Sequence, residues 1–220
     1  PHQVQRFIRE VAQGTPPTCC EKWEQVAESS SLDWVFIGSP NAFHAQQASH
    51  ALRSGRQVFL EKPLAVTRQE CFDLIQVQEE TRRCIAAGFV LRWSPLYREM
   101  YRLIREKNFG SVISFSACEH ISYDHGSYMM RGWRRSRELA GSYVLEKCVH
   151  DLDLIQWMTG ASVSEVAARG GRDLFAGSCK DCISLGGDPS WEEKGNLDLS
   201  HPCTDEPGLV EDHISAVLTC

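Results

Sequence analysis

The chain has 220 residues, 42% of them hydrophobic and 24% charged, with a formal net charge of −6, as in an ordinary globular protein. The negative balance argues against nucleic acid as a partner, and no apolar run approaches the roughly 18 residues of a membrane span. The sequence shows no signal peptide and no Asn-x-Ser/Thr sequon, so we expect a cytoplasmic protein whose ten cysteines are mostly free thiols. Because both ends look cut and the first residue is Pro1, we expect a fragment or cropped isoform.

The first 92 residues alternate apolar strand runs with amphipathic helical runs. This alternation predicts a parallel sheet with helices on its faces. Ser39 or Asn41 is expected to cap the helix that follows the first strand. Helices are expected at residues 3–11, 21–29, 42–54 and 67–81, the last opened by a capping box, and strands at 32–37, 57–60 and 84–90.

Beyond residue 92 the pattern changes. A Ser94-Pro95 pair predicts the start of a helix that reaches residue 107. We expect a long strand at 111–120, a functional loop at 123–141, a helix at 149–158 stopped by Gly160, strands at 163–169 and 213–220, and an irregular stretch at 175–209. The side chains expected to face inward from the first of these helices are Leu96, Met100, Leu103 and Ile104.

Residues 58–65 end a buried strand with an acid, a base and a proline. Pro63 cannot donate to a β-ladder, so Glu61 and Lys62 fall at the carboxyl end of the strand. Ligands bind at that end in open α/β sheets, and right-handed crossovers place the Ser39 turn at the same edge. A buried lysine there could transfer a proton, whereas the alternative interpretation is a surface ion pair beside a turn.

A second charged group lies in the helix expected near residue 150. If residues 146–153 are helical, Glu146, His150 and Asp153 fall within an arc of about 60°. A carboxylate next to an imidazole orients the ring and raises its basicity, which is an arrangement suited to proton transfer. An interdomain histidine beside solvated acids is the alternative.

Three blocks occur in order along the chain: Ser39-Pro40-Asn41-x-x-His44, Glu61-Lys62-Pro63-Leu64-Ala65 and Glu146-x-x-x-His150-Asp151-x-Asp153. Together they resemble the glucose–fructose oxidoreductase/inositol dehydrogenase (Gfo/Idh/MocA) family. The resemblance implies an α/β fold, with a partial Rossmann-type parallel sheet in residues 1–92 and an α/β domain with a largely antiparallel sheet in residues 93–220. It also implies an NAD- or NADP-dependent oxidoreductase that transfers a hydride to or from a sugar, cyclitol or related polyol.

The resemblance further assigns roles to individual residues. The catalytic residues would be Lys62, His150 and Glu146. The cofactor-binding residues would be Gly38, Ser39, Pro40, Asn41, His44, Glu61, Lys62, Pro63 and Arg92. The substrate-binding residues would be Tyr123, Trp133, Arg134 and Asp153. Because some relatives hold the bond before this proline in the cis form, we predict a cis Lys62–Pro63 bond.

The chain departs from the family in one respect, since no G-x-G-x-x-G motif occurs in it. We expect the residues of that pyrophosphate-binding turn to lie upstream of Pro1. The alternative is that the chain is an inactive relative that binds a ligand or partner. A homo-oligomer formed through the C-terminal sheet is also left open. No metal is expected. The alternative is a zinc site whose ligands would be Cys179, Cys182, His201 and Cys203.

Overall fold

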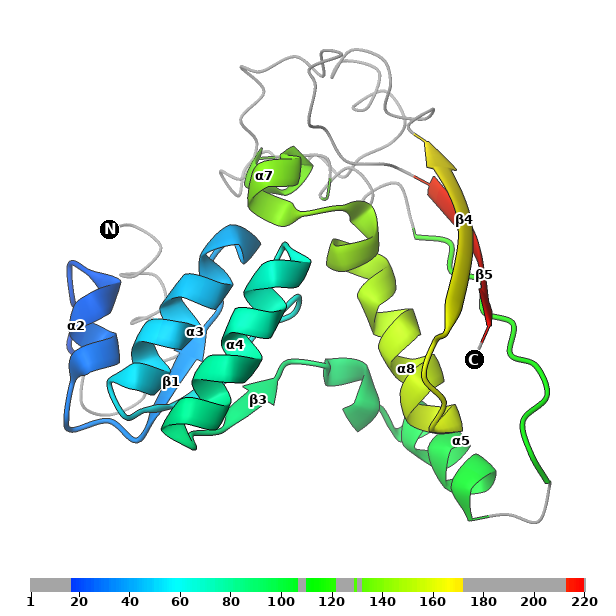
Figure 1. The fold of residues 1–220 in the computed structure, drawn as a ribbon, viewed down its shortest axis with the longest axis horizontal. Helices are drawn as coiled ribbons and strands as arrows, with labels where there is room; N and C mark the ends of the chain where they lie inside the picture. Colours follow the sequence, from blue (N-terminus) through cyan, green and yellow to red (C-terminus); the bar gives the residue numbers. More distant parts are fainter. Residues whose placement is uncertain (1–16, 107–109, 122–128, 130–131, 172–212, 220) are drawn as a thin grey trace.

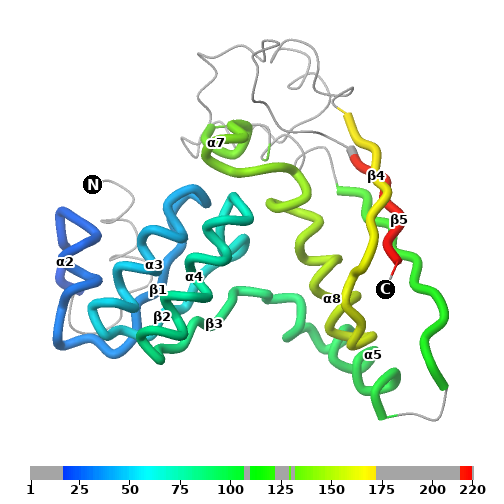
Figure 2. Tube along the Cα trace, in the orientation of Figure 1, coloured from blue at the N-terminus to red at the C-terminus, as the bar shows by residue number. Residues whose placement is uncertain are grey.

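The computed structural model describes residues 17–106, 110–121, 129, 132–171 and 213–219. Its N-terminal part is a small sheet covered by helices, and its C-terminal part contains two long helices beside a two-stranded ribbon (Figure 1). The chain passes from one part to the other after the third strand (Figure 2). None of the described helices combines the length and apolar character that spanning a bilayer requires.

The N-terminal sheet consists of β1 (Trp34–Ile37), β2 (Gln57–Leu60) and β3 (Ile85–Ala87), in that order and all parallel. Ile37 pairs with Leu60, so the Ser39 and Lys62 turns leave neighbouring strands at the same edge. This confirms the predicted sheet and the predicted placement of the two turns. The third strand is shorter than predicted, because the chain turns into η2 (Val90–Trp93).

Three helices, α2 (Trp23–Glu28), α3 (His44–Arg53) and α4 (Arg68–Thr81), accompany the sheet (Figure 1). The capping box predicted for α4 is present, with Thr67 accepting from the backbone of Glu70. The capping predicted for α3 is wrong. A 3₁₀ turn, η1 (Asn41–Phe43), precedes that helix without a side-chain cap, and the side chains of Ser39 and Asn41 bond elsewhere.

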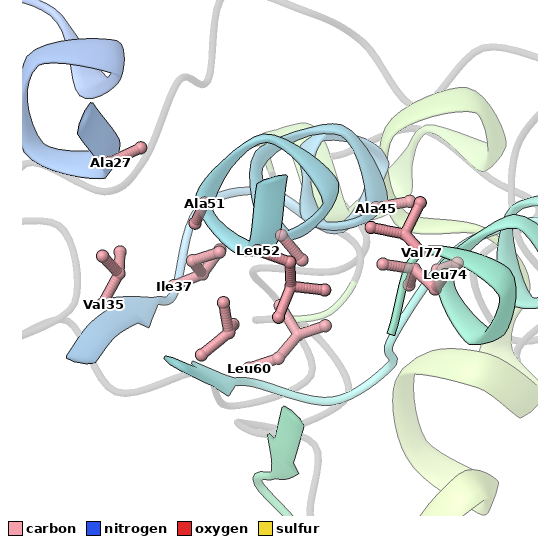
Figure 3. Packing of buried hydrophobic residues seen from close by; sticks show 12 residues of the cluster. Ala27, Val35, Ile37, Ala45, Ala51, Leu52, Leu60, Leu74 and Val77 are labelled. Carbon is pink, nitrogen blue, oxygen red and sulfur yellow. The ribbon is translucent and has the colours of Figure 1, made fainter. Parts of the chain in front are cut away.

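The core of this part lies between α3 and the sheet, as Figure 3 shows. The side chains of β1 and β2 alternate, so that Val58 and Leu60 are buried under the helix. Ala48, Ala51 and Leu52 of α3 are fully buried against them. On the opposite face of the sheet, Trp34 and Phe36 are exposed. The helices therefore cover one face of the sheet and leave the other face exposed.

Replacing Leu52 by alanine is expected to lower the free energy of unfolding by about 2–5 kcal/mol, because the side chain is fully buried and its removal leaves a cavity. Urea denaturation followed by circular dichroism would measure the change. Leu32→Ala is the matched control, since Leu32 is exposed and the same truncation there should cost less than about 0.5 kcal/mol. Equal losses in the two variants would contradict the core described above.

The C-terminal part is built around α8 (Val149–Thr159), which ends at Gly160 in the left-handed conformation. This helix packs against α5 (Pro95–Arg105), where Tyr101 stacks on Trp157 with ring centroids 4.2 Å apart. Ahead of α8 come η3 (Gly132–Arg135), α7 (Arg137–Ala140) and η4 (Val144–Cys148), the last a π-helical turn. The strands β4 (Glu165–Gly171) and β5 (His213–Thr219) pair antiparallel (Figure 1).

Three predictions for this part are wrong in whole or in part. The functional loop predicted at 123–141 forms η3 and α7 in its described stretch 132–141. Of the four side chains predicted to face inward from α5, Met100 and Ile104 are half-buried. Leu96 and Leu103 are exposed, because α8 contacts α5 at Tyr101. Residues 110–121 form no strand, and Ile113 within them is 93% exposed. A strand needs a neighbour for its backbone groups, and these residues pair with none among the described ones. The helix predicted at residues 3–11 and the stretch 175–209 lie outside the described residues.

Candidate active site

Lys62 reaches from the carboxyl edge of the sheet into the C-terminal part of the chain. The Lys62–Pro63 bond is cis, as predicted. The Lys62 ammonium donates to the backbone carbonyl of Glu146, in the π-helical turn, and lies 3.6 Å from Glu146 Oε1. Both side chains are largely buried, with 17% and 12% of their surfaces exposed. The contact joins two of the motif blocks that sequence reasoning singled out.

The Glu146 carboxylate gathers three side chains from three segments. Its Oε1 lies 3.4 Å from Arg134 Nε as well as near Lys62, and its Oε2 accepts a 2.7 Å hydrogen bond from Asn41 Nδ2. The Asn41 amide also donates to the carbonyl of Ala140 in α7, at 2.8 Å. Glu146 therefore ties the sheet edge to the elements before α8.

His150 lies one turn beyond Glu146, but the carboxylate–imidazole pair predicted from α-helical spacing does not form. The π-helical turn follows an i→i+5 pattern, so the assumed α-helical spacing does not hold between Glu146 and His150. The buried Nδ1 of His150 has no hydrogen-bond partner among the described residues. The ring meets Phe89 edge-on, with centroids 6.4 Å apart. A polar atom of His150 is thus left for a ligand or water.

Asp153 pairs with Arg92 rather than with His150. The guanidinium makes two parallel hydrogen bonds to the carboxylate, of 2.7 and 2.5 Å, which is the strong bidentate geometry. The same guanidinium lies over the rings of Phe89 and Trp157. The pair joins η2 to α8, and the predicted contacts of both residues with ligands stay predictions.

The Ser39 turn is held by His44, a residue that is 1% exposed. Its Nδ1 lies 2.7 Å from the carbonyl oxygen of Pro63, and its Nε2 lies 2.9 Å from that of Ser39. The ring therefore links the turn after β1 to the turn after β2. Both ring nitrogens face backbone carbonyls, so these contacts position the two turns, and the predicted contact of His44 with a cofactor stays a prediction.

Glycines bring the two turns close to their neighbours. A Cβ added at Gly38 would meet the ring of Phe36 at 3.0 Å, and one added at Gly88 would meet Glu61 Oε2 at 2.9 Å. Gly88, which sequence reasoning missed, follows β3 and lets Glu61 lie across the backbone. Its only signal in the sequence is a glycine directly after a strand.

Burial shapes the proton affinity of the two proposed proton-transfer groups. Desolvation lowers the pKa of Lys62, against the raising effect of Glu146 and Glu61, and the charge of Arg134 lowers it further. Desolvation also lowers the pKa of His150, assisted by the charges of Lys62 and Lys147. At pH near 7 the imidazole is therefore neutral.

A second ionic cluster beside His150 was missed by sequence reasoning. Lys147 lies 2.6 Å from Glu119 Oε1. Burial, together with the charge and hydrogen bond of Glu119, raises the pKa of Asp151 to about 6. Burial raises the pKa of the Cys148 thiol to about 11, which makes that thiol unreactive at neutral pH. The cluster could not be read from spacing, because Glu119 is distant in sequence.

Of the remaining predicted residues, some are described by the structure and some are not. The Arg134 guanidinium lies over the Trp133 ring, 4.3 Å from the ring centroid, and beside Glu146. Tyr123 and the pair Cys179 and Cys182 lie outside the described residues. Within the described residues, no group of three His, Cys, Asp or Glu side chains could hold a metal ion.

Family comparisons agree with the order of these parts. Residues 2–89 match the model of an oxidoreductase family with an NAD-binding Rossmann fold, and residues 97–220 match the GFO/IDH/MocA C-terminal domain.

Individual relatives point the same way. The chain is 27% identical over 154 residues to scyllo-inositol 2-dehydrogenase (NAD⁺) of Bacillus subtilis, covering 68% of this chain and 43% of that protein. It is 27% identical over 149 residues to 1,5-anhydro-D-fructose reductase of Ensifer adhaerens, covering 66% and 43%. The apo scyllo-inositol dehydrogenase of Lactobacillus casei superposes with a TM-score of 0.55 and 27% identity, over 68% of this chain and 42% of that one. The chain spans about two fifths of the length of the curated relatives it matches.

Proposed function

The chain belongs to the GFO/IDH/MocA family of oxidoreductases, and from this premise we propose that it serves an NAD- or NADP-dependent oxidation or reduction of a sugar, cyclitol or related polyol. The observation that carries the proposal is the position of Lys62. It stands at the carboxyl edge of a parallel sheet and reaches Glu146, four residues before His150. The names of the relatives, an inositol dehydrogenase and an anhydrofructose reductase, support this substrate class.

We divide the chain into a dinucleotide-binding part, residues 1–92, and a substrate part, residues 93–220. The two family matches, 2–89 and 97–220, support this division.

We further propose a cytoplasmic protein, supported by the free thiols of all six described cysteines. Exposed Val166 and Val217 support a homo-oligomer through the β4–β5 ribbon.

The sheet edge fits one half of the cofactor. The backbone of the Gly38–Pro40 turn and the Glu61–Pro63 turn would hold the ribose and nicotinamide. Because the chain contains no G-x-G-x-x-G motif, the residues present fit the nicotinamide half and not the pyrophosphate. A bound nicotinamide supplies the hydride donor or acceptor at its C4 carbon. Asn41 and His44, both buried, would hold the turns in position through their bonds to Glu146 and to the carbonyl of Pro63.

Lys62 would transfer the proton of the reacting hydroxyl, and His150 would help to bind the substrate. An uncharged Lys62 accepts that proton during oxidation, and its ammonium returns it during reduction. The neutral imidazole of His150 would bind a substrate hydroxyl, and its Nδ1, without a partner among the described residues, is available for such a bond. Trp133 and Arg134 would line the substrate side, together with Tyr123 and Asp153.

The pH dependence of polyol oxidation tests the proposal. Nicotinamide absorbance would be followed with NAD⁺ or NADP⁺ and a panel that includes scyllo-inositol and 1,5-anhydro-sugars. We expect kcat/KM for oxidation to rise with pH while Lys62 loses its proton and to level off below the usual lysine pKa of 10.5, because burial lowers that pKa. Reduction should show the opposite trend. No oxidation of any polyol at any pH would contradict the proposal.

A further inference from the structure

One carboxylate oxygen in the site is shared between two cations. Glu146 Oε1 lies 3.6 Å from Lys62 Nζ and 3.4 Å from Arg134 Nε. Both distances exceed the roughly 2.7–2.9 Å of a tight charge-assisted hydrogen bond. Lys62 instead makes its short bond to the backbone carbonyl of Glu146. The ammonium is therefore held in place without a tight salt bridge to the carboxylate.

We propose that Arg134 is a positioning residue for proton transfer: by sharing the Glu146 carboxylate, it keeps Lys62 ready to release its proton. The role in the reaction rests on the proposed function, whereas the coupling between the two cations does not. Arg134 is itself fixed, because its guanidinium lies over the Trp133 ring at 4.3 Å.

Three effects of removing Arg134 have the same sign. Lys62 Nζ and Arg134 Nε are at most about 7 Å apart, because they lie 3.6 and 3.4 Å from the same Glu146 oxygen. The repulsion between the two charges would vanish with Arg134. Glu146 Oε1 would become available for a closer pair with Lys62. Water would enter the space left by the guanidinium and solvate the ammonium. Each effect favours the charged form of Lys62.

The other titratable groups around Lys62 do not replace Arg134. Glu61, on the same turn, and Glu146, in the π-helical turn, favour the ammonium. His150 on α8 has a lowered pKa and carries no charge at pH near 7. Among the groups that act on Lys62 in the described residues, Arg134 is thus the cation that opposes the ammonium charge.

The pKa of Lys62 can be measured on this chain without turnover. Competitive acetylation with acetic anhydride at a series of pH values, read by peptide mass spectrometry, gives the proton affinity of each lysine. In Arg134→Gln we expect the pKa of Lys62 to rise by about one unit. Arg134→Lys, which keeps the charge, should restore most of the original value. Arg135→Gln removes an equal charge from the same turn and is expected to leave Lys62 nearly unchanged.

An unchanged or lowered pKa of Lys62 in folded Arg134→Gln would overturn the proposal. If circular dichroism shows that this variant does not fold, Glu146→Gln decides instead. Removal of the carboxylate should lower the pKa of Lys62, and a rise would overturn the proposal. Since labelling requires neither cofactor nor substrate, a failure here with intact polyol oxidation rejects Arg134 alone. Absent oxidation with the expected labelling rejects only the proposed function.

Discussion

Replacing Lys62 by alanine is expected to lower kcat/KM for polyol oxidation by roughly 10²–10⁴, the usual contribution of a positioned acid or base. The effect should fall on the proton transfer and not on nucleotide binding, because the backbone of the two turns, which the substitution retains, would hold the ribose and nicotinamide. The pH dependence of oxidation described above should disappear in the same variant. Steady-state kinetics over a range of pH values would measure both changes.

Lys22→Ala is the control for this variant, since Lys22 precedes α2 on the exposed surface. It should leave kcat/KM within about twofold, because surface residues away from the site contribute little. Near-normal turnover of Lys62→Ala would remove the lysine from the mechanism. The site would then need another proton acceptor, and His150, with its unpartnered Nδ1 among the described residues, would be the first to test.

Replacing Glu146 by alanine is expected to lower the free energy of unfolding by about 3 kcal/mol. The carboxylate faces Lys62 and Arg134 and accepts a hydrogen bond from Asn41, so its loss removes an anion that two partly buried cations share. The side chains are not fully buried, which places the expected loss at the lower end of the range for buried ion pairs. Urea denaturation would give the value.

Two further variants separate charge from packing at this position. Glu146→Gln keeps an acceptor for Asn41 but removes the charge, so an intermediate loss is expected. Glu138→Ala, at an exposed position of α7, should cost less than about 0.5 kcal/mol. If Glu146→Ala were no more costly than Glu138→Ala, the carboxylate would not hold the two parts of the chain together.

The N-terminal sheet could be predicted because its signals are local. Runs of apolar residues between turns gave all three strands of the parallel sheet, and the capping box at Thr67 and Glu70 gave the start of α4. The edge that carries Ser39 and Lys62 followed from the rule for crossover connections, and the register of β1 with β2 confirms it.

The geometry of the site could not be predicted to the same degree, because it depends on contacts between distant segments. The π-helical turn before α8 has no sequence signature, and it directs Glu146 to Lys62 and Arg134 instead of His150. The pairing of Lys147 with Glu119 likewise joins a helix to a segment wrongly predicted as a strand. Spacing identified the ionizable residues, whereas tertiary contacts decided which of them pair.

If Lys62 lies beside the bound nicotinamide and substrate, as we propose, bound ligands should shield its ammonium from solvent. The most direct test measures how fast acetic anhydride labels Lys62 in this chain with and without millimolar NADH or NADPH and a polyol. We expect ligands to slow the labelling of Lys62 several-fold and to leave that of Lys22 unchanged. Equal labelling of Lys62 with and without saturating ligands, in a chain that binds the nucleotide, would place the nicotinamide elsewhere and contradict the proposed role of Lys62.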